Sequence, residues 1–252
     1  MSHFFRGVLA ASLLCLCSLS ARADGPMTLD QGYFIVFQGD QPVAREHFEY
    51  VRSGDSLVVT AVVERKIRDA SGVEIKFEKT SQTVLSEFDF GMRTYLSKQT
   101  FEDHSTVKNV STDDTTLTVS SEVDGAGGID RIVRPAGRLY VMDPLVFSLF
   151  DIICRSLSPQ SFTKRPIQLI TLGATSTTTE ATVSAAGADT VRWGGKRVVT
   201  RRFVMTDPGS RFTVWMDPKG RMLRLEHDGS GLSVVREQPA VVAPRKKAIA
   251  RK

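Results

Sequence analysis

Residues 143–157 read Asp-Pro-Leu-Val-Phe-Ser-Leu-Phe-Asp-Ile-Ile-Cys-Arg-Ser-Leu, and this stretch differs from the rest of the chain. Asp143 at an N-cap and Pro144 at the first helical position are typical of a helix start. Apolar residues then recur at positions 145/146, 149/150, 153/154 and 157, which is helical spacing. Because Ser158-Pro159 stops the pattern, the sequence predicts one helix over residues 143–157.

This predicted helix is apolar over more than half of its circumference. Exposing such a surface would cost about 1.5–3 kcal/mol for each large apolar side chain. The helix is therefore expected to pack against a sheet or to lie inside a concave one. Asp151 and Arg155, which are four residues apart, are expected to form its solvent-facing stripe.

The remainder of the chain is a succession of extended segments separated by turn residues. Residues 73–78 alternate apolar and charged side chains, which is typical of a strand with one wet face. Asp207-Pro208-Gly209-Ser210 and Asp217-Pro218-Lys219-Gly220 have the composition of tight turns. Strands spaced this closely predict antiparallel hairpins rather than βαβ crossovers. The expected strands cover residues 33–37, 43–51, 57–67, 73–78, 93–101, 105–110, 115–120, 129–134, 167–172, 175–185, 196–206, 211–216, 221–227 and 232–237.

The N-terminal 23 residues have the three-part pattern of a secretory signal peptide. Arg6 provides a positive start, residues 7–19 are uncharged and mostly apolar, and Ala21-Arg22-Ala23 offers small residues to a signal peptidase. We expect cleavage after Ala23 and a periplasmic or secreted protein. A membrane anchor is the alternative, but the run is shorter than the roughly 20 residues that a span needs. Lipid attachment is disfavoured because leucines precede Cys15 and Cys17.

The composition of the chain limits how the mature domain can be stabilised and what it can bind. Only Cys154 remains after cleavage, so no internal disulfide can form and the core must hold residues 24–237 together as a single β domain. The formal charge of +5 comes from the two ends, since without them 26 basic residues face 28 acidic ones. That balance excludes the footprint of a nucleic-acid-binding domain. Residues 238–252 are expected to be a disordered basic tail, with peripheral contact to anionic lipid headgroups as the functional alternative.

The sequence contains no convincing catalytic, metal-binding or cofactor-binding motif. His47 and Glu49 share a strand face, but a zinc site needs further ligands. Asp103-His104-Ser105 cannot form a triad, because neighbouring residues of an extended chain point in opposite directions. Asp228-Gly229-Ser230-Gly231 lacks the glycine spacing of a nucleophile elbow and is expected to be a turn. Cys154 lies on the apolar face of the helix and is expected to be an inert core residue.

The order of these features resembles uncharacterised bacterial periplasmic half-barrel families, domains of unknown function similar in shape to the lipoprotein-localisation carriers. The resemblance covers roughly residues 30–237 and implies a mainly β, strongly curved antiparallel sheet with the apolar helix on its concave face. It implies no catalytic residues. The residues that carry it are Tyr33-Phe34-Ile35-Val36-Phe37, Gly39, Tyr140-Val141-Met142-Asp143-Pro144-Leu145, Gly194-Gly195-Lys196, Val214-Trp215-Met216-Asp217 and Gly220-Arg221-Met222-Leu223-Arg224-Leu225-Glu226.

Three hypotheses for function follow. The first is a non-enzymatic periplasmic protein whose curved sheet binds an acyl chain or another apolar small molecule, unless the helix simply plugs the sheet. The second is an envelope scaffold or assembly partner that binds another envelope protein through an open sheet edge. The third is a hydrolase with dispersed carboxylates. The expected lining of an apolar cradle comprises Phe77, Phe147, Phe150, Ile153, Phe203 and Val214.

Overall fold

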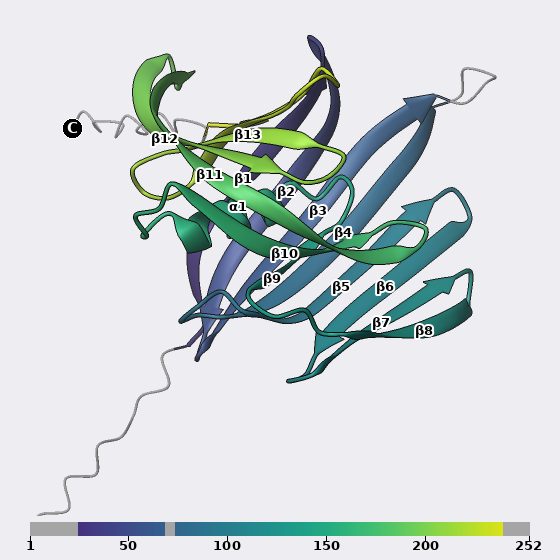
Figure 1. The fold of residues 1–252 in the computed structure, drawn as a ribbon. Coiled ribbons are helices and arrows are strands. Elements are labelled where there is room, and N and C mark those ends of the chain that lie inside the picture. Colours follow the sequence, from purple (N-terminus) through teal and green to yellow (C-terminus); the bar gives the residue numbers. More distant parts are fainter. Residues whose placement is uncertain (1–24, 69–73, 239–252) are drawn as a thin grey trace, which may run out of the picture.

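A computed structural model describes residues 25–68 and 74–238 of the chain. The predicted signal peptide, most of the predicted tail and the turn near residue 70 lie outside these residues. The described strands form a single sheet in the order β8-β7-β6-β5-β4-β3-β2-β1-β15-β14-β13-β12-β11-β10-β9, with no pairing between β8 and β9 (Figure 1). The predicted mainly β fold with one helix is confirmed.

The fifteen strands have the following bounds: β1 (Met27–Gln38), β2 (Gln41–Ser53), β3 (Ser56–Arg68), β4 (Glu74–Ser86), β5 (Met92–Phe101), β6 (His104–Thr112), β7 (Thr116–Val123), β8 (Ala126–Val133), β9 (Leu139–Met142), β10 (Lys164–Leu172), β11 (Ser176–Trp193), β12 (Lys196–Thr206), β13 (Arg211–Met216), β14 (Met222–His227) and β15 (Leu232–Arg236).

The sheet is rolled up rather than flat. Its β9 end contacts the inner side of β5, and the layer that contains β9 to β11 lies in front of the layer that contains β3 to β6 (Figure 1). Strands β6 to β8 extend past this overlap at the other end of the sheet. The two ends of the sheet therefore have different surroundings: β9 is largely buried, whereas β8 is exposed along almost its whole length.

The helix α1 (Ser148–Leu157) lies inside this curl and connects β9 to β10. Strands β9 and β10 are parallel, so β9, α1 and β10 form a βαβ unit. The expectation of antiparallel hairpins throughout is wrong at this place, because a parallel neighbour requires a crossover and the helix provides it. Nine of the ten helix residues are buried, and only Arg155 is partly exposed.

The helix starts later than predicted, and its N-cap is Phe147 rather than Asp143. The side chain of Asp143 is already bound: it pairs with Lys79 of β4 and accepts a hydrogen bond from the Tyr95 hydroxyl at 2.6 Å. Leu145 has φ = 73°, which breaks the helical path after Pro144. The local capping pattern of Asp143-Pro144 cannot reveal that Lys79 of the distant strand β4 binds the Asp143 carboxylate.

The expected solvent-facing stripe of the helix is also wrong. Asp151 is 0% exposed and the Arg155 side chain is 16% exposed. The two side chains do form an ion pair, with 2.9 Å between Arg155 Nε and Asp151 Oδ2. The pair faces the sheet instead of water, because β2 and β14 supply polar partners for Asp151 and β1 supplies one for Arg155.

Two strands run further than the alternation predicted. Strand β4 continues through Ser86, although residues 79–83 carry mostly polar side chains, and Lys79, Ser81 and Thr83 are buried on its inner face. Strand β11 continues to Trp193, and its end packs with Trp215 in a second, smaller apolar cluster separate from the main core. Polar side chains on an inner strand face remove the signal that periodicity relies on.

The position of the helix leads to a prediction about stability. Ile153 is 1% exposed and belongs to the main core, so we expect Ile153→Ala to lower the free energy of unfolding by about 2–5 kcal/mol. Val199 is 63% exposed, and Val199→Ala should change it by less than about 1 kcal/mol. Urea unfolding curves provide both values. Equal, small losses for the two variants would contradict the anchoring role of the helix.

Candidate functional site

Three features bear on function: a buried polar network beneath α1 and a polar pocket, both on the concave face of the sheet, and the open edge of the sheet at β8. The buried network begins at Glu46 of β2, which is 0% exposed. Its carboxylate accepts hydrogen bonds from the backbone N–H groups of Phe147, at 2.6 Å, and Ser148, at 2.9 Å. Glu46 therefore caps the helix from a distant strand and satisfies two donors at its N-terminus.

Burial disfavours the charged form of Glu46 and raises the pKa of its carboxyl group to about 7, although hydrogen bonds from the helix start oppose the shift. The nearby charge of Asp151 raises this pKa further. The carboxyl group of Glu46 at the helix N-terminus is therefore mostly protonated below neutral pH and becomes charged as the pH rises through about 7.

Asp151 is the centre of the network. Its carboxylate accepts hydrogen bonds from the Tyr50 hydroxyl at 2.9 Å, the Met222 backbone N–H at 2.8 Å and Arg155 Nε at 2.9 Å. These donors come from β2, β14 and α1, so a single carboxylate joins elements far apart in the sequence. All of the groups that bond to Asp151 are buried or mostly buried, and these bonds hold the helix in place.

Asp30 of β1 completes the network. Arg155 and Arg236 both bind its carboxylate, with 2.5 Å between Arg236 Nη2 and Oδ1. Burial opposes ionisation of Asp30, but the hydrogen bonds and positive charges of Arg236 and Arg155 outweigh it and hold the pKa below its usual value. Asp30, Asp151 and the two arginines are formally neutral together, which leaves Glu46 as the unbalanced group.

The residues expected to line an apolar cradle are all buried. Five of them, Phe147, Phe150, Ile153, Phe203 and Val214, lie in the main core, and Phe77 is buried on β4 outside that cluster. The void beside the helix at Leu149 and Ile152 measures about 10 Å³. That is close to the volume that a single water needs, so helix and sheet side chains fill the space there. Binding of an apolar ligand by these residues stays a prediction.

A pocket of about 340 Å³ lies on the same inner face, towards the far end of β4 to β7. Polar side chains dominate its floor, and Pro144 and the turn between β10 and β11 cover it. We refer to it as the polar pocket, and its floor consists of Lys79, Ser97, Gln99, Thr106, Lys108 and Ser121.

A larger groove of about 530 Å³ lies where β1 and β15 approach the end of β11. Trp193 is on its wall, and its indole N–H donates to the Arg236 carbonyl at 2.9 Å. Gln238, the last described residue and the first of the predicted tail, also lines this groove. Because the chain continues beyond Gln238 at the wall of this groove, the groove carries no site in our account.

The open edge of the sheet is β8. The Arg134 N–H donates to the Thr115 carbonyl at 2.9 Å, which fixes the phase of hydrogen bonding between β7 and β8. In an antiparallel pair, alternate residues direct their N–H and C=O groups to opposite sides. It follows that Gly127, Ile129, Arg131 and Val133 direct these groups away from β7, towards the side where no described strand lies.

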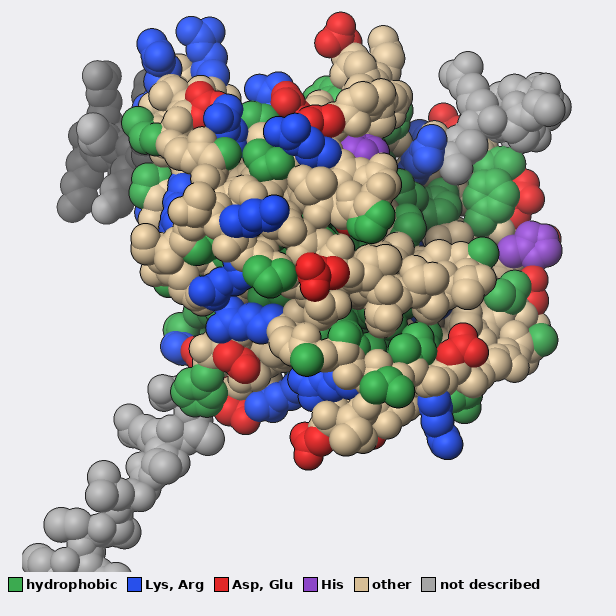
Figure 2. All heavy atoms as spheres, in the orientation of Figure 1, with side chains coloured by type: hydrophobic (Ala, Val, Ile, Leu, Met, Phe, Trp, Pro, Cys, Tyr) green, Lys and Arg blue, Asp and Glu red, His purple; other side chains and the backbone are tan. Residues whose placement is uncertain are grey.

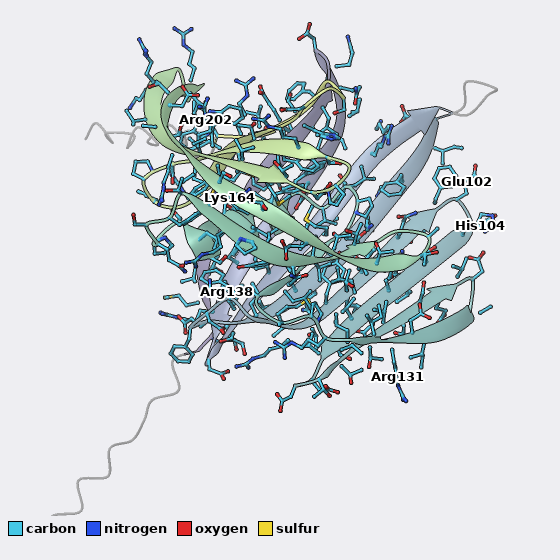
Figure 3. All side chains as sticks on the ribbon, viewed as in Figure 1. Glu102, His104, Arg131, Arg138, Lys164 and Arg202 are labelled. Carbon is cyan, nitrogen blue, oxygen red and sulfur yellow. The ribbon has the colours of Figure 1, made fainter. Side chains whose placement is uncertain are left out.

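The residues that suggested chemistry in the sequence are not assembled into a site. His47 packs against Tyr33 with ring centroids 4.8 Å apart, and Glu49 accepts a hydrogen bond from Thr28. His104 pairs with Asp124 at the exposed tip of the β5–β6 hairpin (Figure 3). Within residues 25–68 and 74–238, no group of three or more His, Cys, Asp or Glu side chains is arranged to hold a metal ion.

Cys154 is buried in the core, as expected. Burial raises the pKa of its thiol, and the Asp151 charge adds to the effect. The described part of the chain contains no helix with the length and apolar character needed to cross a membrane. Lysine and arginine side chains are interspersed with acidic ones on the face shown in Figure 2.

No protein-family model matches the chain, and no curated protein matches it. Among solved structures, its fold is similar to that of a β-barrel-like protein of the domain of unknown function DUF1849 from Brucella abortus. The TM-score is 0.54 at 7% identity, over 82% of this chain and 94% of that chain. At such low identity the similarity shows the fold alone. The resemblance to an uncharacterised, β-barrel-like domain is confirmed at that level.

The buried network leads to a prediction about pH. The pKa of Glu46 is raised on folding, so its contribution to stability is fully present below about pH 4.5 and is lost as the pH rises to about 7. Glu46→Gln cannot titrate, and we expect it to remove up to about 1.4 kcal/mol per pH unit from the pH dependence of unfolding in this window. Urea unfolding of both proteins between pH 4.5 and 8 measures it. Parallel pH profiles would contradict the assigned pKa.

Proposed function

We propose that this protein is an exported, non-enzymatic module of the bacterial cell envelope that binds a partner protein by accepting an extended segment on the β8 edge. The observation that carries the proposal is the uncovered edge of β8. Seven of its eight residues are exposed, and among the described strands it pairs only with β7. Unpaired backbone groups in a row form a template for another strand.

The two ends of the sheet differ in a way that supports this proposal. Strand β9 has only four residues, three of which are buried, so its edge has little room for a further strand. Strand β8 has eight residues, no proline and an unbroken register with β7. Short length, proline, bulges and charged side chains are common means by which proteins protect an edge. Strand β8 carries the charged Asp130 and Arg131 but is neither short nor interrupted by a proline or a bulge.

Side chains next to this edge also fit an added strand. Ile129 and Val133 are 67% and 83% exposed and lie on the same side of β8, with Arg131 between them. Arg131 projects from β8 away from the body of the molecule (Figure 3). Cross-strand contacts with β-branched side chains stabilise strand pairs. An incoming segment with apolar residues at alternate positions would therefore be stabilised by contacts with both Ile129 and Val133.

Export is part of the same proposal, and it rests on the signal-peptide pattern of residues 1–23. The periplasmic location rests on the resemblance to periplasmic half-barrels. The alternative is an acyl cradle, which the unusually apolar helix in an otherwise β chain suggests. We favour the edge because the helix fills the concave face at Leu149 and Ile152, where the void measures about 10 Å³. An acyl chain would have to displace core side chains there.

The edge is tested by a photo-reactive amino acid placed at position 133 of the protein in its native cells. We expect an adduct with one partner protein. Arg131→Pro removes an N–H directed at the partner without removing a bond to β7, so it should reduce the adduct about tenfold. The matched control Arg131→Ala keeps the backbone donor and should retain the adduct within about twofold.

Two results would overturn this function. One is equal loss of the adduct in Arg131→Pro and Arg131→Ala, which would place the contact on the side chain rather than the strand edge. The other is an adduct of the same yield from a probe at Val199, which is exposed on β12 away from the edge. Unchanged thermal unfolding of Arg131→Pro shows that the protein folds.

A further inference from the structure

The polar pocket occupies two adjacent rows of inward-facing residues that cross four strands. One row pairs Lys79 with Gln99, Gln99 with Thr106, and Thr106 with Val123. The neighbouring row pairs Ser81 with Ser97, Ser97 with Lys108, and Lys108 with Ser121. Six of these eight side chains line the pocket as polar groups.

The next rows along the same strands are mainly apolar, with Thr83 and Thr112 as their polar members. They contain Tyr95, Val110, Val119, Leu85 and Leu117, all of which are buried in the main core. The inner face therefore changes from apolar to polar between one row and the next. Hydroxyl, amide and ammonium groups on an inner face are costly unless they form hydrogen bonds, so the polar side chains at the pocket are suited to bind water or a polar ligand.

The charges of the pocket are unequal. The ammonium of Lys79 is neutralised by the buried carboxylate of Asp143 and also donates to the Pro144 carbonyl at 3.1 Å. Lys108 is half-buried and forms no ion pair with any described carboxylate, and its ammonium donates to the Gly173 carbonyl. None of the described residues that line the pocket is acidic. Lys108 is thus an uncompensated positive charge at its wall.

Burial lowers the pKa of Lys108, which shows that its surroundings disfavour the charged form. A bound anion would compensate that charge directly. Lys108 belongs to the floor of the pocket, and its ammonium bonds the carbonyl of Gly173 in the turn that covers the pocket. The Lys108 side chain therefore connects the floor to the cover.

We propose that the polar pocket binds a small hydrophilic anion that carries a carboxylate or phosphate group together with hydroxyl groups, with Lys108 as its charged anchor. The hydroxyls of Ser97, Thr106 and Ser121 and the Gln99 amide can both donate and accept hydrogen bonds, as such a ligand requires. The volume of about 340 Å³ is at the lower end for ligand sites and exceeds that of a bare inorganic ion. This site is separate from the outward face of β8 and does not depend on strand binding there.

NMR titration of the 15N-labelled protein tests the site with four probes: inorganic phosphate, glucose 6-phosphate, glucuronate and neutral glucose. We expect saturable shifts of the Gly173 amide, with millimolar or tighter dissociation constants for glucose 6-phosphate or glucuronate. Inorganic phosphate should bind more weakly because it reaches only Lys108. Glucose should give no saturable shift, since it lacks the charge.

Two charge-removing variants separate a built site from general attraction of anions. Lys108→Met should weaken binding at least about tenfold, as expected when a charge-assisted hydrogen bond is lost. Lys98→Met removes the same charge from the exposed, outward face of β5 and should change binding less than about twofold. Thr106→Val keeps the shape of the floor and should weaken binding several-fold.

The proposal is overturned if none of the three anions gives saturable shifts up to about 20 mM, or if Lys98→Met weakens binding as much as Lys108→Met. Saturable shifts with glucose as strong as those with glucuronate would also contradict it, because they would show that the charge of Lys108 is not used. Near-native amide spectra of the variants confirm that each one folds.

Discussion

The structure depends on the burial of one short helix inside a curled sheet. Helix α1 buries nine of its ten residues, so the sheet has to wrap around it and the core extends over strands from both halves of the chain. A ten-residue helix is marginal by itself, and its stability comes from this packing. The curl in turn separates the two ends of the sheet: β9 is drawn inside, and β8 remains outside.

Burying the helix also buries charge. Asp151 and Arg155 would be costly in the core without partners, and removal of one member of such a pair leaves the other uncompensated. Tyr50, Met222 and Asp30 provide those partners from three different strands, and Arg236 pairs in turn with Asp30. Because these bonds join β1, β2 and β14 directly to the helix, the network specifies the position of the helix.

Much of the fold can be predicted from sequence where turn chemistry brackets a strand. The expected strands at residues 196–206 and 211–216 have the observed bounds, since Gly194-Gly195 and Asp207-Pro208-Gly209-Ser210 mark their ends. The helix ends at Leu157 as predicted, but its start depends on Glu46, more than one hundred residues away in the sequence. Strand β9 was missed because four residues give no periodicity.

The candidate sites were less predictable for a related reason. No pattern within residues 126–133 reveals that the strand lies at the end of the sheet, because strand order is a property of the whole chain. The polar pocket consists of rows across four strands, and each strand contributes only one or two of its polar side chains. Alternation of Lys79, Ser81 and Thr83 is the one local signal, and it is visible only once the inner face is known.

The central claim is that the β8 edge is free in the isolated protein and becomes paired when a partner binds. Amide hydrogen exchange of the protein alone and of its purified complex measures this directly. We predict that Gly127, Ile129, Arg131 and Val133 exchange rapidly in the isolated protein and become strongly protected in the complex, while β9 is unchanged. Protection of these four amides in the isolated protein, or continued rapid exchange in the complex, would contradict the claim.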